Sequence, residues 1–109
     1  TDAIKENLIP KELNKQQINF VYTGEADMLN VALFGLTAKQ WRDAHPKTEG
    51  NIRDDASIEQ SVVLSNMESI NAVLIHQGLK QSKRLQQLNK IAITQMKSLV
   101  QNSQLKKLK

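Results

Sequence analysis

Carboxylate side chains are the groups in this 109-residue chain that could support metal binding or proton transfer, because gathered carboxylates coordinate divalent cations and act as general acids and bases. The clearest pair is Asp54-Asp55, with Glu59 shortly after it. Adjacent acids just before a helix more often interact with the positive end of the helix dipole. An enzyme that uses Asp54, Asp55 and Glu59 is therefore a weaker hypothesis than the two binding functions considered below.

The other residue types with catalytic potential lack the sequence context that catalysis needs. The two histidines, His45 and His76, fall at predicted helix ends, where a histidine usually interacts with the helix dipole. The chain has no cysteine, and its four glycines are scattered, so it offers no thiol nucleophile, no Cys-ligated zinc and no glycine-rich phosphate loop. We therefore predict that the chain is not an enzyme and holds no metal or cofactor.

A loop that contains Arg53 is a second candidate site. The stretch Gly50-Asn51-Ile52-Arg53-Asp54 combines a turn, an apolar anchor and an Arg-Asp pair. We expect Ile52 and an ion pair of Arg53 to pin this loop to the body. The alternative is a partner-binding or ligand-binding loop, with Trp41 and Arg42 from the short helix upstream forming a wall beside it, although a lone tryptophan more often belongs to the core.

Positive charge is concentrated at the C-terminal end of the chain. Residues 1–79 carry seven Lys and Arg against eleven Asp and Glu, whereas residues 80–109 carry eight Lys and Arg and no acid. A basic helix without acids can contact nucleic-acid phosphates, and a solvated face lying on the acidic body is the simpler alternative. The candidate phosphate contacts are Lys83, Arg84, Lys90 and Lys97, with Lys106 and Lys107 as further candidates.

The last helix also has an apolar side. Leu85, Leu88, Ala92, Met96 and Leu99 recur at intervals of three and four residues, which places them on one face. This seam predicts packing against the rest of the chain. Alternatively, it pairs with a second copy and the chain is an oligomerisation module with no nucleic-acid contact of its own.

Capping signals divide the rest of the chain into helices. Asn14 is a plausible N-cap, Thr37 with Gln40 and Ser57 with Gln60 read as capping boxes, and Gly35 and Gly78 are good helix ends. The helix from about residue 58 to 77 has an apolar stripe that Val62, Leu64, Val73 and Ile75 widen, so we expect neighbours on several of its sides. A short link joins it to the basic last helix, which favours an antiparallel pair.

These elements predict an all-α fold: a small orthogonal or antiparallel bundle of about five helices with a long central helix and a basic C-terminal helix. We expect one domain over residues 1–100 and a frayed, lysine-rich tail over residues 101–109. No apolar run is long enough to span a membrane, and the lack of cysteine fits the cytoplasm. The chain begins at Thr1 within a predicted helix, so we also expect a missing N-terminal portion.

Several blocks, in their order and spacing, resemble the C-terminal region of bacterial KilA-N domain-containing proteins, which are common in phage-like and mobile elements. The blocks are Thr1-Asp2-Ala3-Ile4-Lys5-Glu6-Asn7-Leu8-Ile9-Pro10, Glu25-Ala26-Asp27-Met28-Leu29-Asn30-Val31-Ala32-Leu33-Phe34-Gly35, Thr37-Ala38-Lys39-Gln40-Trp41-Arg42, Gly50-Asn51-Ile52-Arg53-Asp54, and residues 85–99.

The resemblance implies a helical accessory domain that follows a DNA-binding KilA-N module. That module would end just before Thr1, so the main contact with DNA would lie outside this chain. The resemblance carries over no catalytic residue. The leading hypothesis is thus an interaction domain of a DNA-associated protein, with weak direct phosphate contacts from the last helix and a homo-oligomer as further expectations.

Overall fold

Five helices make up the described part of the chain in the computed structural model, which describes residues 8–108 and their side chains through residue 102. They are α2 (Lys15–Asn19), α3 (Glu25–Phe34), α4 (Ala38–Ala44), α5 (Ile58–His76) and α6 (Gln81–Leu108). No strand occurs within residues 8–108, so the predicted all-α class is confirmed.

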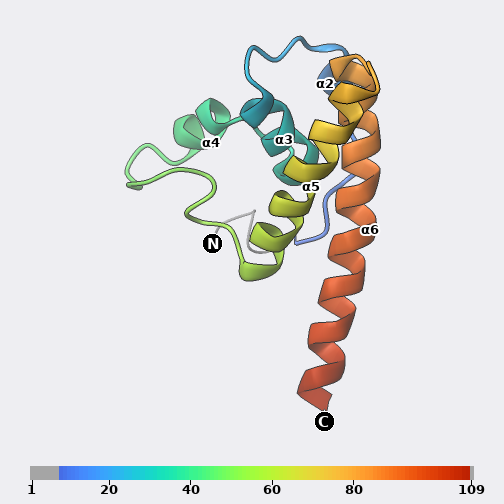
Figure 1. Ribbon diagram of the computed structural model, residues 1–109. Helices are drawn as coiled ribbons and strands as arrows, with labels where there is room; N and C mark the ends of the chain where they lie inside the picture. Colours follow the sequence, from blue (N-terminus) through green and yellow to red (C-terminus); the bar gives the residue numbers. More distant parts are fainter. Residues whose placement is uncertain (1–7, 109) are drawn as a thin grey trace.

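The helices start and stop where their capping residues require. Asn14, Thr37 and Ser57 each cap a helix through a reciprocal capping box, which satisfies amides that the first turn leaves without an intrahelical acceptor. Gly35 and Gly78 end α3 and α5 with φ of 76° and 79°, a left-handed conformation that glycine adopts at low cost. The chain then turns through a short link, so α5 and α6 run antiparallel (Figure 1).

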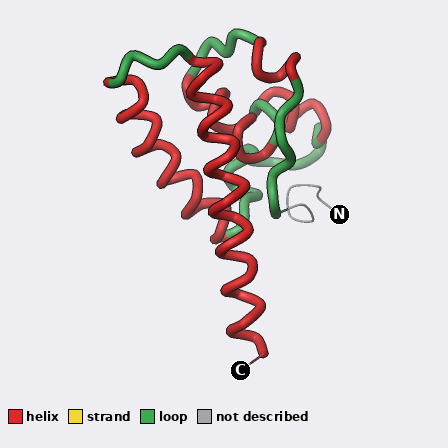
Figure 2. The backbone as a smooth tube through the Cα atoms, turned by 90° about the vertical axis from the view of Figure 1, so that its right-hand side faces the viewer, coloured by secondary structure: helices red, strands yellow, loops and turns green. Residues whose placement is uncertain are grey.

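Helix α6 is the organising element of the bundle, because it packs against α5, α3 and α2. Its seam residues Leu85, Leu88, Ala92 and Met96 are fully buried and share one core cluster with residues of α3 and α5, and Leu99 packs against that cluster. Figure 2 shows that the C-terminal turns of α6 project beyond the rest of the described chain.

A smaller second cluster holds α4 and the loop that follows it. Trp41 and Ile52 are each 1% exposed and pack with Phe34, Leu36 and Ala38. The Trp41 ring also stacks on His45, with ring centroids 4.5 Å apart. The loop is thus fastened by Ile52, as predicted.

The wide apolar stripe expected on α5 is only partly present. Leu64 is buried in the core, but Val62, Val73 and Ile75 are about half exposed. Helix α2 ends at Asn19, and Val21 beyond it is exposed. The domain division expected at residue 100 stays a prediction, and α6 continues through this point to Leu108. The helix expected at Thr1 falls outside the described residues.

Candidate nucleic-acid interface

The outward side of α6 is a basic stripe made by Lys83, Lys90 and Lys97, all of which are exposed. They are seven residues apart, which is nearly two helical turns, so they share one side of the helix and repeat about every 10 Å along its axis. Gln87 and Thr94 fill the positions between them and are also exposed. Because α6 contains no acidic residue, the stripe can contact several phosphates of one nucleic-acid strand.

Among the described residues, the acid Glu12 lies near this stripe. Glu12 and Lys90 line the same small hollow, of about 150 Å³, together with Leu13, Ile18, Gln86 and Asn89. A carboxylate at that point opposes an approaching phosphate. The stripe is therefore least favourable to an anion at Lys90 on the side that faces Glu12.

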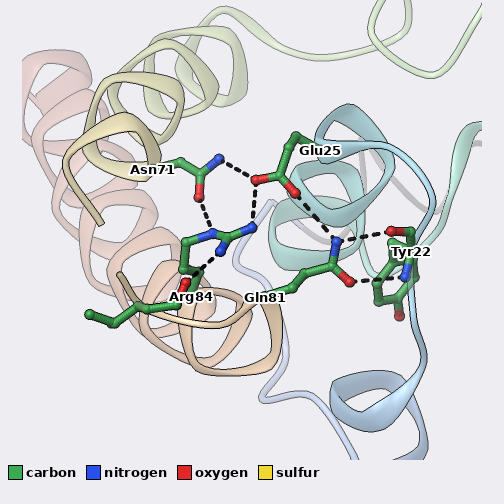
Figure 3. Close-up of polar contacts among 6 residues, drawn as sticks. Tyr22, Glu25, Asn71, Gln81 and Arg84 are labelled. Atoms are coloured by element: carbon green, nitrogen blue, oxygen red, sulfur yellow. Dashed lines mark hydrogen bonds and ion pairs between the residues drawn. The ribbon is translucent and has the colours of Figure 1, made fainter. Parts of the chain in front are cut away.

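Arg84 does not belong to the stripe, which corrects its assignment as a phosphate contact. Its side chain is 11% exposed and points into the junction of three helices, as Figure 3 shows. Nη2 donates to Glu25 Oε1 at 2.7 Å, Nε donates to Asn71 Oδ1 at 3.0 Å, and Nη1 donates to the Leu79 carbonyl at 2.6 Å. These three acceptors use all three nitrogens of the guanidinium, so Arg84 stabilises the packing of the helices.

Glu25 is the acceptor at the centre of this polar cluster. Its carboxylate also accepts from Asn71 Nδ2 at 3.0 Å and from Gln81 Nε2 at 3.3 Å. Partial burial by itself would raise the pKa of Glu25, but the hydrogen bonds from Asn71, Gln81 and Arg84 and the positive charge of Arg84 outweigh it, so the pKa lies below its ordinary value. The cluster joins the start of α3 to the end of α5 and the start of α6.

Gln81 extends the cluster to the segment before α3. Its amide forms a reciprocal pair with the Tyr22 backbone, in which Tyr22 N donates to Oε1 and Nε2 donates to Tyr22 O, both at 2.9 Å. Sequence reasoning missed Glu25, Asn71 and Gln81, because no local spacing relates residues that lie 13 to 59 positions apart.

The loop around Arg53, for which partner binding was the alternative hypothesis, is held against the body of the chain. Trp41 is buried, Arg42 is exposed, and Arg53 Nε donates to Asn30 Oδ1 at 3.2 Å, so a hydrogen bond stands where we expected an ion pair. Within the loop, Asn51 N donates to Asp54 Oδ2 at 3.0 Å. Gly50 has φ of 91°, and a Cβ at this position would lie 2.8 Å from that same oxygen. The loop is closed on itself and on α3.

The apolar seam of α6 is likewise not a surface. Leu85, Leu88, Ala92 and Met96 are each 0% exposed within a single chain. A second copy cannot reach them without opening the core, so the seam as an oligomer interface is wrong. Its period was predicted correctly, but its partner is the chain's own α3 and α5.

The acidic residues of the described part of the chain do not gather into a metal site. Among residues 8–108 no group of three or more His, Asp and Glu is placed to hold a metal ion. An apolar hollow of about 430 Å³ lies between residues 9–14 and the end of α3. Its lining includes Pro10, Leu33, Phe34 and Gln60 and contains no pair of acids, histidine or hydroxyl group.

Comparison of the chain with protein-family models, curated proteins and solved structures found no match. The family resemblance of the sequence blocks therefore stays a prediction. No helix within residues 8–108 is long and apolar enough to cross a lipid bilayer. The side chains of Lys106 and Lys107 lie outside the described residues, so the stripe is defined by Lys83, Lys90 and Lys97.

Proposed function

We propose that this chain is a helical accessory domain of a KilA-N-type, DNA-associated protein, and that the basic stripe of α6 contacts phosphates without reading base sequence. The observation that supports the proposal is the set of three exposed lysines at seven-residue spacing on a helix without acids. Lysine contacts to phosphate release counterions and carry no sequence information. The stripe therefore adds affinity and leaves sequence recognition to another module.

The resemblance places that module, KilA-N, before Thr1 in the full-length protein. On this proposal the protein belongs to a phage-like or mobile element, acts in the cytoplasm and is not an enzyme. The domain supplies an interaction surface, and the KilA-N module supplies the main DNA contact. The gene's full-length sequence tests this part directly, because a KilA-N module must be encoded upstream of Thr1.

Titration of a labelled DNA duplex with this chain at low salt tests the direct contact. We expect weak binding that is independent of duplex sequence and disappears at moderate salt, because about one counterion is released per phosphate contacted. The variant Lys83→Glu/Lys90→Glu/Lys97→Glu should bind no duplex. Absence of binding at low salt, or binding equally strong in the triple variant, would disprove the role of the stripe.

A further inference from the structure

The outer face of α5 is more apolar than the solvent-exposed face of a helix usually is. Opposite its buried side it presents Ile58, Val62, Ser65, Ser69, Ala72 and Val73, all of which are exposed. Ile58 is 81% exposed, Val62 46% and Val73 55%. A solvated helix normally carries charged residues on this side, as α6 does with its three lysines, yet these six residues include none.

No other part of the described chain covers this face. Figure 2 shows α5 at one edge of the bundle, with α6 and the remaining helices all on its other side. A different side of α5 packs into the core of the bundle and carries Val63, Met67 and Leu74. The outer face is therefore additional apolar surface that the monomer does not use.

We propose that the outer face of α5 is a homodimer interface, in which α5 packs antiparallel against α5 of a second copy. Small residues stand at its middle, where Ser65 and Ser69 let two helix backbones approach closely, and the larger apolar residues stand toward its ends. A two-fold axis at the level of residue 67 places Ser65 opposite Ser69 and Val62 opposite Ala72. The larger Val62 then meets the smaller Ala72, and the same patch of each copy faces the other, as a two-fold interface requires.

The charges at the two ends of α5 select a second copy in this orientation. Asp54 precedes the helix and Glu59 lies in its first turn, whereas Lys80 follows its last turn. The two-fold axis at residue 67 sets Asp54 of one copy at the level of Lys80 of the other. An antiparallel copy brings the acidic end of one helix against the basic end of the other at both ends of the contact. A parallel copy would place like charges together, which is unfavourable.

Sedimentation of the chain over about 1 µM to 1 mM, a range that covers moderate and weak association, tests the proposal. We expect a monomer–dimer equilibrium. Ser65→Glu/Ser69→Glu should be monomeric, since it places four carboxylates at the crossing point, and Ser65→Lys/Ser69→Lys should be monomeric for the same reason. An equal mixture of the two variants should restore a one-to-one dimer. The matched control Gln87→Glu/Thr94→Glu, on exposed positions of α6, should dimerise like the parent.

Engineered cysteines test the orientation and do not depend on those charged variants folding well. The chain has no cysteine of its own, so any disulfide reports on the introduced residues. Oxidation of Ile58→Cys mixed with His76→Cys should give a cross-linked heterodimer, and Ile58→Cys alone should give little. A monomer throughout the concentration range, a dimer that survives Ser65→Glu/Ser69→Glu, or efficient Ile58→Cys self-linkage would overturn the proposal.

Discussion

Arg84 Nη2 lies 2.7 Å from Glu25 Oε1, and this ion pair joins the first turn of α6 to the first turn of α3 across 59 residues of sequence. Asn71 of α5 contacts both members of the pair, donating to Glu25 and accepting from Arg84. Three helices therefore meet at one set of hydrogen bonds. The residue that sequence reasoning assigned to nucleic acid instead fixes how these helices are arranged.

Replacing Arg84 should lower stability and leave phosphate contacts nearly unchanged. Arg84→Met keeps much of the apolar stem but removes every donor, so Glu25, Asn71 and the Leu79 carbonyl lose a partner. We expect a loss of about 2–3 kcal/mol in the free energy of unfolding, because hydrogen bonds to a charged group are strong but Glu25 keeps partial access to water. Urea denaturation measures this loss. Lys83→Met, which removes an exposed cation, should cost almost nothing, and equal losses in the two variants would contradict the assignment.

Acid should weaken the fold through Glu25. Its pKa in the folded chain lies below the ordinary value of 4.5, so the folded state favours the ionised carboxylate. The resulting stabilisation is fully present above pH 4.5 and is lost as the pH falls through the lower, folded-state pKa. Urea midpoints of the parent and of Glu25→Gln should therefore differ most near neutral pH and converge in acid. A gap that stayed constant from neutral pH to pH 3 would show that ionisation of Glu25 is irrelevant.

Single lysine replacements should reveal how many phosphates the stripe contacts. Each of Lys83→Gln, Lys90→Gln and Lys97→Gln should reduce the slope of log K against log salt by about 1. Lys47→Gln, which makes the same charge change in the loop before α5, is the control and should leave the slope alone. Glu12→Gln should strengthen binding, since it removes the acid that shares a hollow with Lys90. A weaker complex in Glu12→Gln would mean that DNA approaches from elsewhere.

Asn89 should prove essential for holding residues 11–13 onto α6. It is buried, and its Nδ2 donates to the carbonyls of Ala32 and Lys11 while Oδ1 accepts from Leu13 N. The isosteric Asn89→Asp turns the donor into an acceptor that faces two carbonyls, so we expect a loss of about 2–3 kcal/mol. Hydrogen exchange at the Leu13 amide should quicken. Protection that matched the parent would mean that the segment is held by other contacts.

Trp41 should report on the loop through its fluorescence, because it is the only tryptophan. Ile52→Ala leaves a cavity beside the indole and should destabilise the small cluster by about 2–4 kcal/mol. Water then reaches Trp41, and its emission maximum should move to longer wavelength. Val21→Ala, at a position that is 80% exposed, should change neither stability nor emission. Unchanged emission in Ile52→Ala would indicate that the loop does not cover the ring.

Local chemistry made much of the fold predictable. Thr37 and Ser57 each bond an amide three residues away, so their capping boxes could be identified from four residues of sequence. The seam on α6 followed from helical period alone. The spacing of apolar residues identifies the buried face of a helix but not the element that covers it. The spacing on α6 was therefore also compatible with a dimer seam, which the complete burial of Leu88 within one chain excludes.

The candidate site was less predictable, because its composition depends on distant residues. Lys83 and Arg84 are adjacent and both cationic, yet only Arg84 meets an acid, and that acid is supplied by α3. The prediction that Val62 and Val73 widen the buried stripe of α5 was wrong for a related reason. Val62 and Val73 look like core residues in sequence, and their exposure becomes evident only once the other helices are placed on the opposite side.

The central position of α6 also determines when the chain can fold during its synthesis. Asn89 bonds to carbonyls 57 and 78 residues earlier, and α2, α3 and α5 all pack on α6. A nascent chain that has emerged only as far as α5 lacks the helix against which α2, α3 and most of α5 pack, so Met28 and Met67 cannot be fully buried. Folding must therefore wait until the ribosome has delivered α6, and until then the apolar faces of α3 and α5 are exposed to chaperones and to aggregation.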